Sequence, residues 1–143
     1  MLYSFVALIL LQIYQPSLNS DNGIILPVHF IKINDVPADV QSIFKQACYD
    51  CHSNNTNYKW FDRVQPARLW IEFHISKAKK DLNFSEWGNY SSRKQKNKLD
   101  RIVKQIGSRE MPLASYAMFH NKAKLTDAEK ERIIQWVTEL KDN

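Results

Sequence analysis

One pentapeptide, Cys48-Tyr49-Asp50-Cys51-His52, constrains this chain more than any other part of the sequence. It contains both cysteines of the chain, and their i, i+3 spacing puts the two thiols on one side of a single helical turn. In covalent haem attachment, each of two such thiols adds across a vinyl group of the porphyrin, and the histidine that follows supplies an axial nitrogen to the iron. The pattern therefore predicts one haem c per chain, attached through Cys48 and Cys51 and ligated by His52.

Two other kinds of site also use a pair of cysteines at this spacing. A structural zinc site needs a second pair of closely spaced ligands, whereas the remaining histidines, His29, His74 and His120, are scattered singly. A thioredoxin-like redox pair follows a β-strand in a βαβ pattern, whereas this pair follows a segment with helical periodicity. The sequence favours haem over both alternatives.

The iron of an electron-transfer haem usually has a second axial ligand, and Met111 is the predicted one. It lies in Glu110-Met111-Pro112-Leu113, a segment that follows a predicted helix and is free to place a thioether over the haem. His74 is the main rival, because it lies on the apolar face of another predicted helix, where a histidine can also be a core residue. Two further candidates are Met118 and His120.

Composition and periodicity predict an all-α domain. Hydrophobic residues make up 44% of the chain and charged residues 24%, which suffices for a packed core, and the low counts of 3 glycines and 5 prolines argue against a turn-rich β-sandwich. Four segments have apolar residues at helical spacing. They are Val40, Ile43, Phe44 and Ala47; Trp70, Ile71, His74, Ile75, Ala78 and Leu82; Leu99, Ile102, Val103 and Ile106; and Ile133, Ile134, Val137 and Leu140. Pro66 is placed to begin the second helix, Gly107 to cap the third, and a capping box of Thr126 and Glu129 to begin the fourth.

Residues 2–14 are almost wholly apolar. This stretch of about 13 residues is shorter than the roughly 20 that cross a bilayer as a helix, so it suits the hydrophobic region of a signal peptide or a short membrane anchor. A buried helix is the alternative. No Lys or Arg precedes the stretch and no small-residue cleavage site is obvious, so the sequence leaves open whether the segment is removed. We expect a signal peptide or anchor at residues 1–16, a linker and extended lead-in at 17–34, and the haem-binding domain at 35–143.

The chain carries a net charge of +5, and its basic residues concentrate in two runs, Lys77–Lys80 and Arg93–Lys98. Such runs usually form solvated helix faces, but they can also steer an acidic partner toward a docking surface. No nucleic-acid-binding motif accompanies the charge, so nucleic acid is not an expected partner. No nucleophile–base pair and no paired carboxylates stand at a telling spacing, so the sequence does not indicate an enzyme.

A family resemblance rests on six segments, which together span about residues 35 to 137. They are Val36–Val40, Ala47–Thr56, Gln65-Pro66, Leu82–Trp87, Glu110–Leu113 and Ala123–Thr126. They resemble the small haem-binding domain proteins of Bacteroidetes-type bacteria, which carry a single Cys-x-x-Cys-His. The resemblance implies a periplasm-facing haem domain behind a hydrophobic N-terminal anchor. By analogy with other c-type cytochromes, the Pro66 carbonyl is expected to accept a hydrogen bond from the second ring nitrogen of His52; the alternative is that Pro66 only begins a helix.

These expectations combine into one predicted function. A small all-α domain of about four helices, cytochrome c-like in architecture, holds one covalently bound haem with His52 and Met111 as axial ligands. It exchanges single electrons with redox partner proteins in the periplasm or at the outer face of a membrane. The alternative is a haem-based sensor or peroxidase-like module, in which the sixth iron position is open and Met111 is structural.

Overall fold

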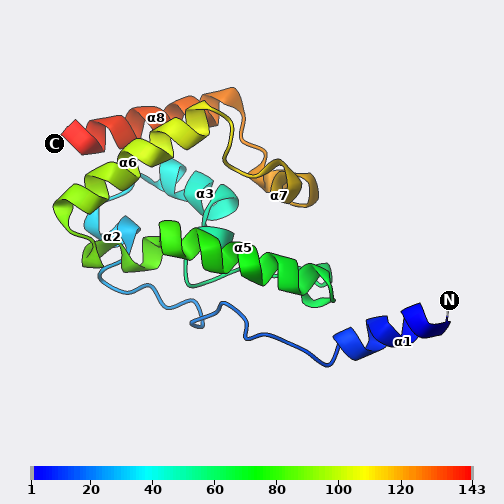
Figure 1. The fold of residues 1–143 in the computed structure, drawn as a ribbon. Coiled ribbons are helices and arrows are strands. Elements are labelled where there is room, and N and C mark those ends of the chain that lie inside the picture. Colours follow the sequence, from blue (N-terminus) through cyan, green and yellow to red (C-terminus); the bar gives the residue numbers. More distant parts are fainter. Residues whose placement is uncertain (1, 143) are drawn as a thin grey trace.

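A computed structural model describes residues 2–142, and within that range the chain is helical, with no β-strand (Figure 1). The predicted all-α class is confirmed. Four helices coincide with the four predicted ones: α3 (Ala38–Ala47), α5 (Ala67–Asp81), α6 (Ser92–Gly107) and α8 (Asp127–Asp142). The shorter elements are α1 (Leu2–Leu11), α2 (Phe30–Ile33), α4 (Tyr49–His52), α7 (Ala114–Phe119) and the 3-10 helices η1 (Phe61–Arg63), η2 (Phe84–Asn89) and η3 (Asn121–Ala123).

The long helices form two layers around α3 and α4. Helices α6 and α8 lie side by side and antiparallel, and α8 also packs on α3 (Figure 1). Helix α5 lies on the other side, where it contacts α4. Because α4 carries the second cysteine and the histidine of the pentapeptide, this arrangement places the predicted attachment turn between the two layers.

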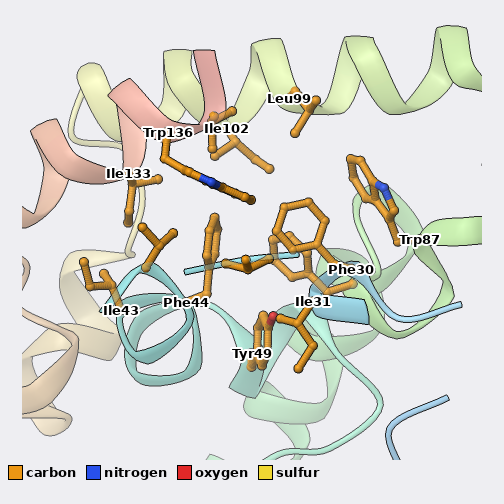
Figure 2. Packing of buried hydrophobic residues seen from close by; sticks show 14 of the residues in the cluster. Phe30, Ile31, Ile43, Phe44, Tyr49, Trp87, Leu99, Ile102, Ile133 and Trp136 are labelled. Atoms are coloured by element: carbon orange, nitrogen blue, oxygen red, sulfur yellow. The ribbon is translucent and has the colours of Figure 1, made fainter. Parts of the chain in front are cut away.

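An aromatic cluster forms the centre of the core. Phe30 and Phe44 are fully buried, and the Phe30 ring lies 5.5 Å from the ring of Phe44 and 4.8 Å from that of Trp87 (Figure 2). Burying one such side chain stabilises the fold by about 1.5–3 kcal/mol. Residues 17–34 were expected to form an extended lead-in, but the segment ends in α2, whose Phe30 reaches the centre of this cluster. The segment has only a weak helical pattern, and we attribute the short helix at its end to the burial of Phe30 in the core.

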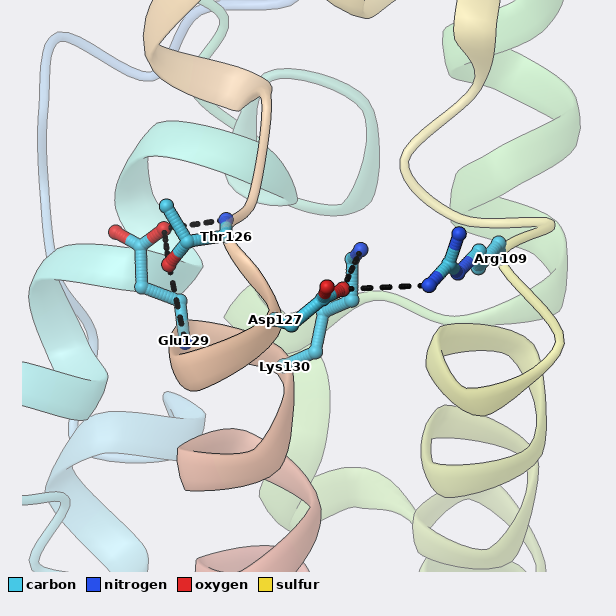
Figure 3. Close-up of polar contacts among 5 residues, drawn as sticks. All are labelled: Arg109, Thr126, Asp127, Glu129 and Lys130. Atoms are coloured by element: carbon cyan, nitrogen blue, oxygen red, sulfur yellow. Dashed lines mark hydrogen bonds and ion pairs between the residues drawn. The ribbon is translucent and has the colours of Figure 1, made fainter.

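Helix ends follow the local sequence signals closely. The Glu129 backbone N–H donates to the Thr126 hydroxyl over 3.2 Å, and the Thr126 N–H donates to the Glu129 carboxylate over 2.8 Å, so the predicted capping box is confirmed (Figure 3). Pro66 takes the N-cap position directly before α5, whose first residue is Ala67, so the helix starts next to the predicted proline. Gly107 is the last residue of α6 rather than its cap, and Ser108 takes the cap position.

Helix α1 is apolar and exposed. The exposed fractions of its large apolar side chains from residue 3 onward run from 38% for Leu11 to 89% for Tyr3. The chain just beyond this helix is tied to the start of α5, because the Gln65 N–H donates to the Gln12 side chain over 3.0 Å and the Gln65 side chain donates to the Tyr14 carbonyl over 2.6 Å. Within residues 2–142, no helix combines the length and the hydropathy that crossing a membrane requires.

Candidate functional site

The pentapeptide forms a separate helical turn at the end of α3. The backbone of Cys48, at φ −125° and ψ −40°, breaks the helix, and α4 follows it. The N–H groups of Cys51 and His52 both donate to the Cys48 carbonyl, over 3.2 Å and 2.9 Å. Both thiols are free. The pentapeptide therefore forms one helical turn, but its two thiols line different cavities, so the predicted placement of both on one side of the turn is not seen here.

The imidazole of His52 is held in one orientation by a backbone carbonyl. Its Nδ1 lies 3.0 Å from the Leu82 carbonyl oxygen and donates to it, which leaves Nε2 as the nitrogen available to a metal. Burial lowers the pKa of His52, so the ring stays neutral, which is the form that binds iron. The expected contact from Pro66 is wrong: the Pro66 carbonyl accepts the Trp70 N–H at the first turn of α5 instead. His52 lies against the opposite, C-terminal end of that helix.

A largely apolar cavity lies in front of His52, and we call it the His52 cavity. Cys48 and Met111 line it together with His52. Its volume is about 80 Å³, which is below the roughly 300–1,000 Å³ that is usual for cofactor sites, and it is partly open to solvent. The other lining residues are Phe44, Ala47, Asp81, Leu82, Phe84, Lys98, Arg101, Ile102, Gln105 and Ile106.

Met111 is positioned by the end of α6. The N–H groups of Glu110 and Met111 both donate to the Gln105 carbonyl, over 3.0 Å and 3.1 Å, and this holds the segment against the helix. The half-buried Met111 side chain lines the same cavity as His52. The structure therefore brings together three of the four predicted site residues, Cys48, His52 and Met111.

The other candidate ligands lie elsewhere. A second cavity is lined by Cys51, His74 and His120 among others. His74 donates from Nδ1 to the Trp70 carbonyl over 2.8 Å, within its own helix. The His120 ring stacks on Tyr116 at 4.1 Å, and Met118 is 63% exposed. Cys48 and Cys51 thus border two different cavities, and only that of Cys48 also contains His52 and Met111.

The environment of the thiols disfavours the two alternative kinds of site. Burial raises the pKa of both Cys48 and Cys51 to about 12, and interaction between the two groups adds to the rise at Cys48. The thiols are therefore protonated at neutral pH, whereas disulfide exchange needs a thiolate. A structural zinc site uses four protein ligands. Among residues 2–142, no group of even three His, Cys, Asp or Glu side chains lies close enough to hold a metal ion.

Sequence reasoning missed two groups that the structure places at this site. The first is the Leu82 carbonyl, for which no local signal exists, because the backbone of any residue could supply it. The second is Lys98, which was expected on a solvated face and is instead buried in the wall of the His52 cavity. Its position four residues before Ile102, on the apolar face of α6, is a signal that could have revealed it.

The residues of the His52 cavity suit a haem, since an oriented neutral imidazole, a thioether and a thiol border an apolar space with a polar edge. A family model described as a haem-binding domain matches residues 6–139 of the chain. The comparisons with curated proteins and with solved structures gave no significant match. Because the family match covers nearly the whole sequence, this chain belongs to the haem-binding domain family.

Proposed function

We propose that this chain binds one haem c covalently through Cys48 and Cys51 and uses it to transfer single electrons. The observation that carries the proposal is the meeting of Cys48, His52 and Met111 in one apolar cavity at the attachment turn. When bound, the haem supplies an iron that gains or loses one electron. Attachment consumes no oxidant, because each S–H adds across a vinyl double bond, with the sulfur bonding to one carbon and the hydrogen to the other.

The side chains of the cavity have distinct roles in this proposal. His52, oriented by the Leu82 carbonyl, presents Nε2 to the iron, and the hydrogen bond at Nδ1 makes the imidazole a better electron donor. The rings of Phe44 and Phe84 exclude water from the bound group. Met111 would hold the iron through its thioether, a ligand that would favour the reduced state. The presence of Met111 in the His52 cavity favours this six-coordinate site over a sensor or peroxidase-like module with an open position.

We propose acidic redox proteins as the partners. The two basic runs come together in the fold, because α5 and α6 are joined by η2 and Lys98 Nζ donates to the backbone carbonyl of Asp81 at the C-terminal end of α5. Lys77, Lys80 and Lys94 are exposed on these two segments. Such a field raises the rate of encounter with an acidic protein more than the affinity for it. We propose neither an enzymatic activity nor a nucleic-acid partner.

The proposed location is the periplasm, with attachment to the inner membrane through the N-terminal segment. Support comes from α1, whose apolar side chains are exposed, and from the hydrogen bonds between Gln12 and Gln65 that connect the end of this segment to the folded domain. An apolar helix of this kind lowers its free energy by entering lipid.

A haem stain tests the central claim. The full chain is expressed in bacteria that possess the haem c attachment machinery and is run on a denaturing gel, beside a variant with both Cys48→Ala and Cys51→Ala. We expect the stain to remain on the unmodified chain and to be absent from the variant, and an alkaline pyridine spectrum to report haem c. Reversible one-electron reduction of the loaded protein then tests electron transfer. An unstained band from the unmodified chain would overturn the proposal.

A further inference from the structure

We propose that Lys98 binds a carboxylate at the polar edge of the His52 cavity and that this carboxylate is a propionate of the haem. The inference rests on the proposed haem binding and assigns one edge of the ligand to a named side chain. It starts from the buried ammonium group of Lys98, which forms no ion pair with a carboxylate among residues 2–142.

Lys98 is 7% exposed, which is unusual for a lysine. A buried cation costs free energy unless an anion accompanies it. Burial lowers the pKa of Lys98, and the charge of the nearby Asp81 only partly opposes that effect. The ammonium group therefore lies in a place that favours the approach of a further negative charge.

The present contacts of the ammonium group do not neutralise it. Its Nζ donates to the backbone carbonyl of Asp81 and lies 4.7 Å from the centre of the Tyr90 ring. The Asp81 carboxylate is used by Arg101, whose second guanidinium nitrogen donates to it over 2.8 Å. Among residues 2–142, no carboxylate oxygen lies within 4.0 Å of Lys98 Nζ, the limit for an ion pair.

The distribution of polar groups in the cavity points to the class of ligand. Lys98, Arg101 and Gln105 follow one another at i, i+3 and i+7 on α6, so they share one face of that helix. Among residues 2–142, Asp81 supplies the only carboxylate in the wall, so with the two cations these residues give the wall a net charge of +1 when His52 is neutral. The rest of the wall is almost wholly apolar. Haem is a flat apolar ligand with carboxylates at one edge, so its ring matches the apolar part of the wall and its carboxylates match the part that carries Lys98 and Arg101.

The test compares two lysines that contact the same ring. Lys94 Nζ lies 5.0 Å from the centre of the Tyr90 ring, but Lys94 is exposed and does not line the cavity. In haem-loaded protein, the reduction potential is measured against pH for the unmodified chain, Lys98→Met and Lys94→Met. An adjacent cation holds a carboxylate ionised to lower pH, typically by about one pKa unit or more. We therefore expect the pH-dependent part of the curve to move up by about one pH unit in Lys98→Met only. Lys98→Arg is expected to keep the original curve.

Two outcomes would overturn the proposal: a curve for Lys98→Met that matches that of Lys94→Met, or a Lys98→Arg curve displaced as far as that of Lys98→Met. Lys98→Gln gives the same comparison if the methionine variant does not fold, as judged by circular dichroism. Failure of haem binding itself is recognised separately, because the unmodified chain would then give no haem stain and no potential to measure.

Discussion

The Nδ1 atom of His52 lies 3.0 Å from the carbonyl oxygen of Leu82, a residue 30 positions further along the chain. That carbonyl begins a segment whose side chains are tied to the loop after the attachment turn. Asn83 donates to the Asn54 side chain over 2.9 Å, and the Asn54 N–H donates to the Ser85 hydroxyl over 3.0 Å. The orientation of the imidazole thus depends on a small network of buried polar groups.

Asn83→Ala is expected to weaken this network. The side chain is 3% exposed and also accepts the Ser85 N–H over 3.0 Å, so its removal leaves buried groups without partners. We expect the free energy of unfolding to fall by about 1–3 kcal/mol in urea titrations. The potential of the loaded protein is expected to rise, because a weaker hydrogen bond makes His52 a poorer electron donor. Asn89→Ala, at an exposed position, is the control; equal effects of both substitutions would contradict this role.

The helices were predictable because their signals are local, whereas the contacts that complete the site are not. The apolar spacing of α3 and the capping box of α8 are read directly from neighbouring residues. By contrast, Phe30 gains its central place from α3 and η2, which lie far along the chain. The Leu82 carbonyl is one of many chemically identical groups, so only the folded backbone shows which of them reaches His52.

The candidate site was predictable to the extent that each residue type carries its own chemistry. The thioether of Met111 lies in a loop, which predicted it as an iron ligand, and in the structure Met111 lines the His52 cavity. The separation of His74 from that cavity depends on which face of α5 turns toward α4, and the spacing of apolar residues alone did not determine it. The basic run favoured an exposed Lys98, and only its place on the apolar face of α6 pointed to the burial that the structure shows.

We expect that a residue larger than glycine fits poorly at position 88, whereas position 107 has room for one. A Cβ added at Gly88 would lie 2.7 Å from the Ile33 Cδ1 and 3.1 Å from the Val28 Cβ, so the packing of α2 against η2 would have to shift. A Cβ at Gly107 would meet nothing closer than 4.0 Å. We expect Gly88→Ala to lower the free energy of unfolding by about 1 kcal/mol and Gly107→Ala to raise it slightly, since alanine favours helix. Urea unfolding checks both, and a neutral Gly88→Ala would show that α2 adjusts easily.

Loss of stability on mild acidification is expected from His29. This residue is 4% exposed, and its Nδ1 accepts the Ile31 N–H at the start of α2. Burial lowers the pKa of His29, and Lys45 adds to this while Asp21 opposes it. The unfolded chain, with a histidine pKa of about 6.5, therefore takes up a proton before the folded chain does, so stability falls as pH drops below about 7.

The matched variant for this prediction is His29→Asn, which keeps an acceptor at the helix start but does not titrate. Unfolding of the haem-free protein is measured at pH 8 and pH 5. We expect the difference between the two pH values to be smaller in His29→Asn than in the unmodified chain. The difference is not expected to vanish, because burial also lowers the pKa of His52. If His29→Asn keeps the full pH dependence, His29 does not contribute to it.

The identity of the sixth ligand is tested most directly by Met111→Leu. Leucine fills a similar volume in the cavity but has no sulfur, so the change removes the thioether with little loss of packing. The ferric spectrum of the loaded protein is expected to lose its weak far-red sulfur-to-iron band, the potential to fall, and carbon monoxide to bind the ferrous protein faster. Met118→Leu is the control, since that side chain is 63% exposed. If the band is absent from the unmodified protein and His74→Ala changes the spectrum instead, the ligand is His74. Rapid carbon monoxide binding to the unmodified ferrous protein would indicate an open sixth position and favour the sensor or peroxidase-like alternative.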